Sequence, residues 1–426
     1  MRALEKERIV VALVGVSEPG YTSQANAYLR EALKSDSRLP EIWVTTLDFE
    51  ISFDPWWMVY RILELDPVPD FVCFSVYCWN AEAIFTVSRI LSSINPVISL
   101  VVGGPEVGPT PGETLARHGE IFAVVEGEGE RTLPEIMLSF ARGGDPFGID
   151  GVSVNDNGRV KVGPPAKPIA DLDSVASPYT DAHPPATDGS AYLESFRGCP
   201  HRCAYCFEAK GSTRIRSHSW KRIERDVARM ASTPGMTAFS FIDSVFNLTS
   251  DRLKKLADIM EPWAKRGIRL HTIEVDIEAI DESQAKDLKR AGVASVETGP
   301  QTTGCKALRA CSRTLDKEKY LRGVAACRKA GITVEADLII GLPGDTVEDV
   351  LDSLRFVLSA DPGTLQISTL RVLPGTPLWD EADDLGVVFD HETPHEVVAT
   401  ETLGFAELRQ LEVFGVALQK LYRSKK

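Results

Sequence analysis

The sequence lacks the features that mark membrane-spanning, secreted and nucleic-acid-binding proteins. No apolar run reaches the ~18 residues that indicate a membrane helix. The charged start, Met1 to Glu7, has no signal-peptide pattern. Acidic residues outnumber basic ones by 61 to 47, and the net charge of −14 argues against nucleic acid or an anionic membrane as a partner. We therefore expect a cytoplasmic protein with no membrane or nucleic-acid partner.

Histidine and cysteine are scarce and unevenly placed. The chain has seven histidines, and none precedes His118. Three of the eight cysteines lie in one loop, at Cys199, Cys203 and Cys206, with the spacing C-x3-C-x2-C. In a cytosolic chain, clustered cysteines favour metal binding or catalysis over a disulfide framework.

The cysteine loop admits two metal-binding interpretations. A structural zinc ion takes four protein ligands, and the sequence offers no fourth ligand nearby, since His201 lies between two of the cysteines. An iron–sulfur cluster fits better, because three thiolates leave one iron open to bind a substrate. Tyr205, just before the last cysteine, can shield such a cluster from water.

Apolar strands alternate with helices in the first third of the chain. Strands are expected at residues 9–16, 42–47, 71–76, 98–102 and 122–126, with helices at 23–34 and 81–93. This order predicts an open, parallel, doubly wound sheet. A ligand of such a sheet binds outside the carboxyl ends of the strands, where glycine-rich loops fall at 103–104 and 127–129.

Strands and helices alternate again from about residue 190. Strands are expected at residues 192–196, 238–242, 269–274, 293–297, 333–340 and 365–372. Six such repeats predict an incomplete (β/α)6 barrel with its chemistry at the C-terminal strand ends, and the cysteine loop follows the first strand. We expect an α/β protein with a Rossmann-like domain, a linker with a hairpin, a partial barrel and a helical tail, at residues 1–142, 143–185, 186–380 and 381–426.

The segment from Ser195 to Phe207 resembles the cluster loop of radical S-adenosylmethionine (radical SAM) enzymes, down to the aromatic residue before the last cysteine. The resemblance implies that Cys199, Cys203 and Cys206 hold a 4Fe-4S cluster whose open iron binds SAM. It also implies that an external flavodoxin- or ferredoxin-like reductant supplies one electron. SAM is then cleaved to a 5′-deoxyadenosyl radical, which abstracts a hydrogen atom from the substrate.

Four later segments resemble strand ends of the same family, at residues 241–247, 296–302, 336–346 and 370–377. The resemblance implies that SAM is contacted by Asp243, Glu297, Gln301, Ile340 and Arg371. Asp243 has a second interpretation, as the N-cap of a helix over 249–261. An arginine among Arg309, Arg313 and Arg371 could pair with the SAM carboxylate, although a structural ion pair accounts for any one of them as well.

The domain before the barrel resembles that of cobalamin-dependent radical SAM enzymes, in residues 74–80, 102–106 and 127–131. The resemblance implies cobalamin contacts from Tyr77, Trp79, Gly103, Gly104, Glu106, Gly127 and Glu128. One departure is that the loop after the first strand, 17–23, has no histidine to bind cobalt. A vestigial domain without cobalamin is therefore the alternative.

The combined resemblance implies a methyltransferase that uses cobalamin to methylate an unactivated carbon of a small molecule. One alternative is a non-methylating radical SAM reaction: a rearrangement, an oxidation or transfer of a 3-amino-3-carboxypropyl group. A second is a metal-bound sensing protein without enzymatic activity. The residues after about 380 hold no further cysteine cluster, which favours a small molecule over a peptide as the substrate.

Overall fold

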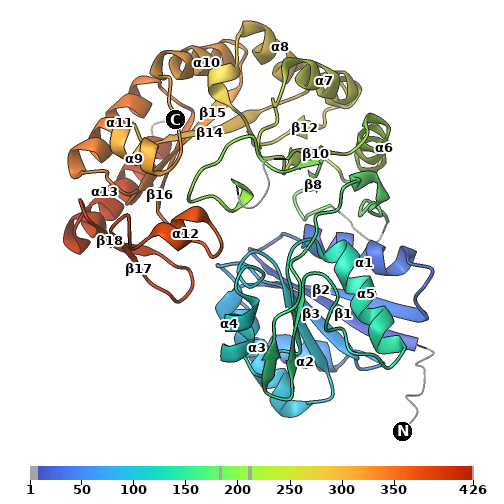
Figure 1. Cartoon of the computed structure of the whole chain (residues 1–426). Helices are drawn as coiled ribbons and strands as arrows, with labels where there is room; N and C mark the ends of the chain where they lie inside the picture. Colours follow the sequence, from blue (N-terminus) through green and yellow to red (C-terminus); the bar gives the residue numbers. More distant parts are fainter. Residues whose placement is uncertain (1–7, 182–184, 210–213, 425–426) are drawn as a thin grey trace. The chain divides into compact units, whose positions relative to one another are not determined.

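The structure is a computed structural model that describes residues 8–181, 185–209 and 214–424 (Figure 1). The chain divides into two compact units, Met1–Thr187 and Asp188–Lys426. Among the described residues, no helix has the length and apolar character needed to cross a membrane.

The first unit is built on a seven-stranded sheet with the order β2-β1-β3-β4-β5-β6-β7. Strands β1 to β5 are parallel, which confirms the predicted doubly wound sheet. The strands are β1 Arg8–Ser17, β2 Glu41–Glu50, β3 Phe71–Ser75, β4 Ser99–Gly103, β5 Ala123–Val125, β6 Val152–Asp156 and β7 Arg159–Lys161.

The hairpin expected within the linker forms, but it does not stand apart from the first domain. Strand β6 pairs antiparallel with β5, and β7 pairs with β6. Val152 and Val154 are buried and belong to the same apolar cluster as Ala123. As alternate residues of one strand they point to the same face, so this face of the hairpin packs against the core. The segment after the hairpin also packs on this unit, since Ile169, Leu172 of the 3-10 helix η1 (Leu172–Ser174) and Val175 cluster with Tyr28.

Helices cover both faces of this sheet, which explains why β1 is apolar almost throughout. One face packs against α1 and α5, and the other packs mainly against α2 and α3. The helices are α1 Gln24–Ser35, α2 Pro55–Leu63, α3 Ala81–Ile94, α4 Pro111–Arg117 and α5 Gly129–Ala141.

The strand order reverses between β1 and β3, and a single buried side chain joins the ends of these two strands. The amide nitrogen Nδ2 of Asn80 donates to the carbonyls of Val16 (3.0 Å) and Ser75 (3.2 Å). Its Oδ1 accepts from the backbone nitrogen of Tyr77 (2.7 Å), and Asn80 is 2% exposed. Ligands of doubly wound sheets bind at such a reversal, so Asn80 fixes the backbone beneath the expected ligand crevice.

The second unit contains an incomplete barrel of parallel strands. Strands β8, β11 and β12 form one sheet and β13 to β16 another, and a parallel bridge from Leu270 to Val293 continues between them. Figure 1 shows these strands as an open arc with helices outside it, which confirms the predicted partial barrel. They are β8 Ser190–Leu193, β11 Ala238–Phe241, β12 Arg269–Leu270, β13 Ile273–Glu274, β14 Ser295–Gln301, β15 Thr333–Ile340 and β16 Thr364–Thr369.

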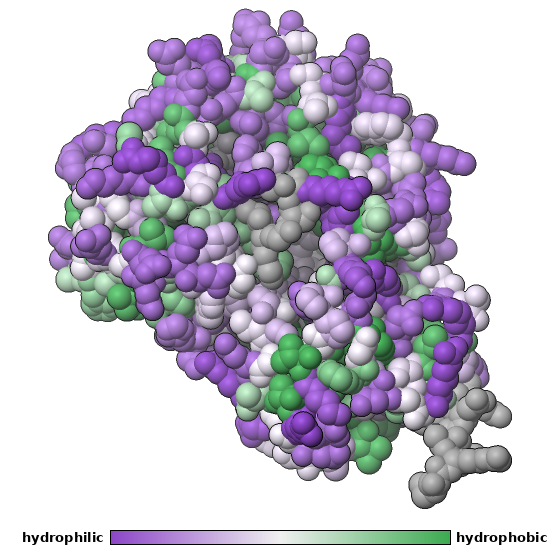
Figure 2. Space-filling model, in the orientation of Figure 1, coloured by the Kyte–Doolittle hydropathy of each residue, from purple (hydrophilic) through white to green (hydrophobic). Residues whose placement is uncertain are grey.

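Helices follow the barrel strands, and their outer surface is mostly hydrophilic in Figure 2. Side-chain caps fix most of their starts, including a capping box between Thr346 and Asp349 at the start of α11. The helices are α6 Trp220–Ala231, α7 Ser250–Ala264, α8 Glu282–Arg290, α9 Cys305–Ala310, α10 Lys317–Lys329, α11 Val347–Ser359 and α12 Pro377–Glu381, with the short 3-10 helices η2 Phe207–Ala209 and η3 Ile277–Ala279.

The tail contains the predicted helix, α13 (Phe405–Ser424), which packs on β16 and buries Leu408 and Leu411. Phe405, at the start of this helix, is 60% exposed. The sequence pattern missed a hairpin before this helix, β17 (Val387–Phe389) with β18 (Val397–Thr400). A second short hairpin, β9 (Phe196–Arg197) with β10 (Arg216–Ser217), flanks the cysteine loop.

Replacing Asn80 with Ala should lower the free energy of unfolding of the first unit by about 2–3 kcal/mol, because it leaves buried backbone groups without partners. Ser93→Ala is the matched control. The Ser93 hydroxyl donates to the carbonyl of Arg89 at an exposed site. Its removal should therefore lower the free energy of unfolding by about 0.5 kcal/mol or less. Chemical denaturation of the full chain followed by circular dichroism measures both changes. A midpoint for Asn80→Ala equal to that of Ser93→Ala would contradict the role of this side chain.

Candidate functional site

The cysteine loop begins directly after β9, at the C-terminal end of the first barrel strands. Gly198, which precedes the first cysteine, has φ +104°, and a Cβ there would lie 2.9 Å from the carbonyl oxygen of Arg214. Only glycine fits this position without strain. The hydroxyl of Ser244, at the end of β11, donates to the carbonyl of Gly198 (2.8 Å). The start of the loop is therefore fixed by a neighbouring strand.

The middle of the loop is held from two other elements. The backbone nitrogen of Ala204 donates to the carbonyl of Cys311, at the end of α9 (3.0 Å). The carbonyl of Ala204 accepts from the nitrogen of Leu378, in the first turn of α12 (2.9 Å). Both hydrogen bonds use backbone groups, so they hold the loop whatever its side chains do.

The donor set of the loop fits an iron–sulfur cluster. Cys199 and Cys203 are buried and Cys206 is half-buried. Burial raises the pKa of the Cys199 thiol, while a hydrogen bond with Ser244 opposes this shift. Within the described ranges, no three His, Cys, Asp or Glu side chains are arranged to hold a single metal ion. In a cluster each thiolate binds a different iron atom, so the three sulfurs need not converge on one point.

Asp243 anchors the entry to the cysteine loop. It is 1% exposed and accepts hydrogen bonds from the backbone nitrogens of Ser195 (2.8 Å) and Phe196 (3.3 Å) and from the Ser195 hydroxyl. Arg252 lies 3.8 Å away, and burial raises the pKa of Asp243 to about 6. The interpretation of Asp243 as a helix N-cap is wrong, because Thr249 caps α7. Its contact with SAM stays a prediction.

Carboxylates converge inside the barrel, on strands whose neighbouring positions pair in register. Glu297 on β14 pairs with Glu335 on β15, and Asp337 lies two residues further along the same face. Asp337 donates a hydrogen bond to Glu297; burial, together with Glu297 and other nearby carboxylates, raises its pKa to about 9. Burial and the neighbouring Glu297 also raise the pKa of Glu274 to about 7. A proton is therefore held between Glu297 and Asp337 at neutral pH.

Two side chains on β14 and β15 carry buried acceptor atoms that have no protein partner among the described residues: Oδ1 of Asp337 and Oε1 of Gln301. Gln301 lies at a bulge in the pairing of β14 with β15 and has φ +63°. An ammonium or ribose hydroxyl group could donate to such acceptors. Sequence analysis did not assign Asp337, although Glu335 and Asp337 alternate as polar residues on an otherwise apolar strand.

The other two residues expected to contact SAM differ in position: Ile340 lines a small cavity together with Gln301, whereas Arg371 lies past the end of β16. The side chain of Ile340 is buried in the apolar core, and its carbonyl accepts from the nitrogen of Leu370 (2.9 Å). Arg371 is exposed and lies just past β16, where its backbone forms an isolated antiparallel β-bridge with Glu396. Their contacts with SAM remain predictions.

In the first unit, an aromatic platform follows the end of β3. The rings of Tyr77 and Trp79 stack at 4.4 Å with an angle of 10° between their planes, and Trp79 is 52% exposed. Burial raises the pKa of the Tyr77 hydroxyl. The backbone nitrogen of Tyr77 donates to Asn80, so the platform lies at the strand-order reversal, where a flat ring can stack on it.

The glycine loops at the same edge are explained by protein packing. A Cβ on Gly104 would lie 2.5 Å from the carbonyl oxygen of Val76, to which the nitrogen of Glu106 also donates (3.3 Å). A Cβ on Gly127 would lie 2.9 Å from Ala166. Gly103 ends β4, and the carboxylate of Glu128 accepts from the nitrogen of Ile169 (2.6 Å). The predicted cobalamin contacts of these residues stay untested.

The first unit also contains a buried hydrogen-bond donor, on the side chain of Asn26. Nδ2 of Asn26 has no partner in the described part of the chain, while its Oδ1 accepts from Ser75 at the end of β3 (3.3 Å). His118 is not a candidate cobalt ligand at the carboxyl edge. It caps the C-terminus of α4, which runs back toward the amino ends of the strands, and it stacks on Phe85.

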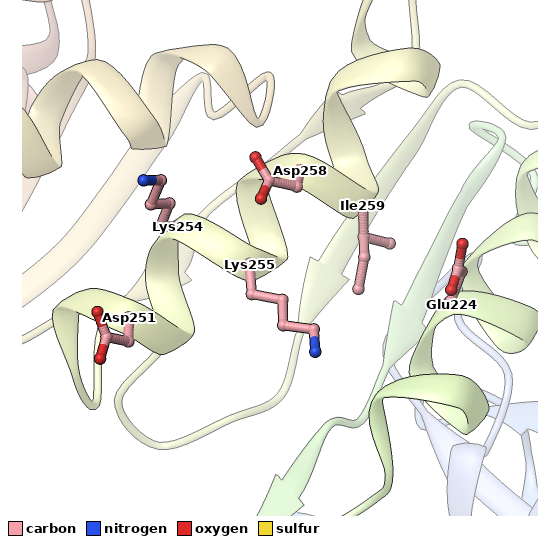
Figure 3. Close-up of a pocket in the computed structure, with 6 residues that line it drawn as sticks. All are labelled: Glu224, Asp251, Lys254, Lys255, Asp258 and Ile259. Carbon is pink, nitrogen blue, oxygen red and sulfur yellow. The ribbon is translucent and has the colours of Figure 1, made fainter.

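A surface pocket of about 310 Å³ lies away from these groups, on the outer helices α6 and α7 (Figure 3). Its lining is charged and mostly exposed, with Lys255 over the ring of Trp220 and Asp258 paired with Arg290. The pocket therefore does not belong to the site at the strand ends.

Comparisons with known proteins match both halves of the molecule. Residues 193–357 match the Radical SAM superfamily, and residues 59–137 match the B12 binding domain. The chain is a radical SAM protein with an N-terminal B12-binding domain. A radical SAM domain uses a 4Fe-4S cluster and SAM, and a B12-binding domain binds cobalamin. The two matches therefore confirm the three predicted cofactors.

Two methyltransferases are similar to this chain at low identity. The radical SAM protein is 28% identical over 321 residues to the uncharacterized methyltransferase PH0819 of Pyrococcus horikoshii, covering 74% of this chain and 69% of that protein. It is 24% identical over 392 residues to the cobalamin-dependent radical SAM methyltransferase TokK of Streptomyces tokunonensis, covering 86% of this chain but 56% of TokK.

The fold is also found in a solved structure. The radical SAM methyltransferase TsrM from Kitasatospora setae, with cobalamin and a 4Fe-4S cluster bound, superimposes with a TM-score of 0.73 at 20% identity. The match covers 92% of this chain and 82% of TsrM. This likeness confirms the predicted succession of a Rossmann-like domain, a partial barrel and a C-terminal helix.

Replacing Asp337 with Asn should stabilise the radical SAM protein at high pH. The folded-state pKa of Asp337 is about 9, above the ordinary value near 4, so its favourable contribution is complete below about pH 4 and is lost as the pH rises toward 9. The side-chain amide of Asn at position 337 still donates a hydrogen bond to Glu297, and it does not ionise as the pH rises. At pH 8 the variant should therefore be more stable by up to about 5 kcal/mol, with little difference near pH 4.

Thermal unfolding of the cofactor-free protein at pH 4, 6 and 8 measures this difference. Asp251→Asn, on the exposed first turn of α7, is the control and should follow the wild-type profile. A stability difference between Asp337→Asn and wild type that does not change with pH would show that the shared proton is absent.

Proposed function

We propose that this protein is a cobalamin-dependent radical SAM methyltransferase that methylates an unactivated carbon of a small molecule. One observation carries the proposal: a loop of three cysteines is fastened at the carboxyl edge of a partial barrel, in a chain that also has a B12-binding domain. The names of PH0819 and TokK, both methyltransferases, support the choice of methyl transfer.

The protein's own groups have distinct tasks in this proposal. When bound, the cluster and SAM supply a radical and cobalamin supplies the methyl group. Cys199, Cys203 and Cys206 would hold the cluster. The acceptors of Gln301 and Asp337 would meet the ammonium group or ribose hydroxyls of SAM.

The B12-binding domain and the shared proton complete this assignment. The stacked rings of Tyr77 and Trp79 would support the corrin ring from one side. The proton held between Glu297 and Asp337 reduces the negative charge in the lumen, so that the lumen accommodates the carboxylate of SAM with less repulsion.

The finer parts of the proposal concern partners and organisation. We place the enzyme in the cytoplasm, with an external one-electron reductant and a small-molecule substrate. We assign cobalamin binding to residues 1–142 and radical chemistry to 186–380. The hairpin of β6 and β7 belongs to the first unit, and α13 packs on β16 of the second.

Replacing any of the three loop cysteines with Ala should remove most of the iron, because each thiolate binds a separate iron atom. Iron and sulfide assays and the visible absorption of anaerobically reconstituted protein measure the loss. The exposed Cys305→Ala, on α9, is the matched control and should retain the wild-type iron content. A Cys203→Ala protein with a full cluster would refute the ligand assignment.

Reconstituted enzyme with SAM, reductant, cobalamin and a candidate small-molecule substrate should produce both 5′-deoxyadenosine and S-adenosylhomocysteine, because hydrogen abstraction from the substrate and remethylation of cobalamin each consume SAM. Chromatography with mass spectrometry detects both products, and omission of cobalamin should abolish S-adenosylhomocysteine alone. Methylthioadenosine in their place would indicate 3-amino-3-carboxypropyl transfer. Neither product above background would refute an enzymatic role of this type.

A further inference from the structure

Arg313 lies just beyond α9 and contacts the cysteine loop through a side chain rather than the backbone. Its Nη1 donates to Sγ of Cys203 (3.1 Å) and to the hydroxyl of Tyr205 (3.0 Å). Its Nη2 donates to the carbonyl of Gly299 on β14 (2.8 Å). The planar guanidinium thus spans a cysteine, the aromatic residue beside it and the strand that carries Glu297.

We propose that Arg313 is a positioning residue that raises the reduction potential of the 4Fe-4S cluster by donating a charged hydrogen bond to the thiolate of Cys203. Because this role needs Cys203 to be a cluster ligand, it rests on the function proposed above. It adds to that function a control on how readily the cluster accepts the electron that starts each turnover.

The physical basis is the charge that the cluster gains on reduction. A positive donor beside a ligand sulfur stabilises the more negative, reduced state, and hydrogen bonds to sulfur are a known determinant of cluster potentials. Cys203 is 6% exposed, so little water screens the interaction. A guanidinium remains protonated under all physiological conditions, so the effect does not depend on pH.

The geometry separates this electronic role from a structural one. The loop is already held by backbone hydrogen bonds that Ala204 donates to Cys311 and accepts from Leu378, and by the hydroxyl of Ser244, which donates to Gly198. Removing the guanidinium therefore leaves these attachments in place. What it removes is the donor on Sγ and the positive charge next to it.

Arginine suits this position better than lysine does. The fork offers two nitrogens, so one serves Cys203 and Tyr205 while the other binds Gly299. A lysine carries a single charged nitrogen and cannot serve both sides at these distances. Arg313→Lys should therefore keep only part of the effect.

The test measures the midpoint potential of the cluster by redox titration followed by electron paramagnetic resonance, without SAM, cobalamin or substrate. Arg313→Gln should make reduction less favourable by about tenfold in the equilibrium constant, which is about 59 mV for a one-electron couple. Arg313→Lys should fall between this variant and wild type. Lys306→Gln, which removes an exposed positive charge from α9, is the matched control and should leave the potential unchanged.

A second variant keeps the test decisive if Arg313→Gln fails to hold iron. Tyr205→Phe removes the competing acceptor and leaves Nη1 to Cys203 alone, so the hydrogen bond to the thiolate strengthens and the potential should rise above the wild-type value. An unchanged or lower potential in Tyr205→Phe, or a wild-type potential in fully loaded Arg313→Gln, would overturn the proposal.

A different outcome would point to SAM rather than to the cluster. If Arg313→Gln keeps the wild-type potential but binds SAM more weakly by isothermal titration calorimetry, Arg313 pairs with the SAM carboxylate and the proposed role is wrong. Failure of the proposed function is distinguishable from both results, because it would appear as a full cluster in Cys203→Ala.

Discussion

The site depends on how a loop with little regular structure is held still. Between Cys203 and Cys206 the chain makes no strand, yet Ala204 offers its nitrogen to Cys311 and its oxygen to Leu378. Asp243 holds the entry to the loop, because it accepts hydrogen bonds from the backbone nitrogens of Ser195 and Phe196. These contacts come from segments far apart in the sequence, so the thiolates are positioned only when the whole barrel is folded.

The two domains position their functional groups in the same way. Each places its functional groups past the carboxyl ends of parallel strands, where side chains and loop backbones are free of the sheet's own hydrogen bonds. In the barrel this edge carries the cysteine loop and the polar lumen. In the B12-binding domain it carries the platform of Tyr77 and Trp79, next to the junction that Asn80 makes between β1 and β3.

The sequence predicted the elements well, because the buried parallel strands are apolar runs and the cysteine spacing is specific. It could not predict contacts that depend on strand register. The hydrogen bond from Asp337 to Glu297 requires β14 and β15 to align in the register that pairs Glu297 with Glu335. The helix cap expected of Asp243 is made instead by Thr249. Gly104 and Gly127 stand in loops that resemble ligand-binding loops, yet each also makes room for a neighbouring segment of the chain, which only the structure shows.

The aromatic platform has a consequence for the entropy of binding. Tyr77 is joined through its backbone to Asn80, and its ring is already stacked on Trp79. Both rings are therefore already oriented before a flat ligand binds, so the two side chains lose little rotational freedom on binding. In a chain without a histidine to ligate cobalt from the first loop, affinity can come from this prior ordering of the surface instead of from one strong bond.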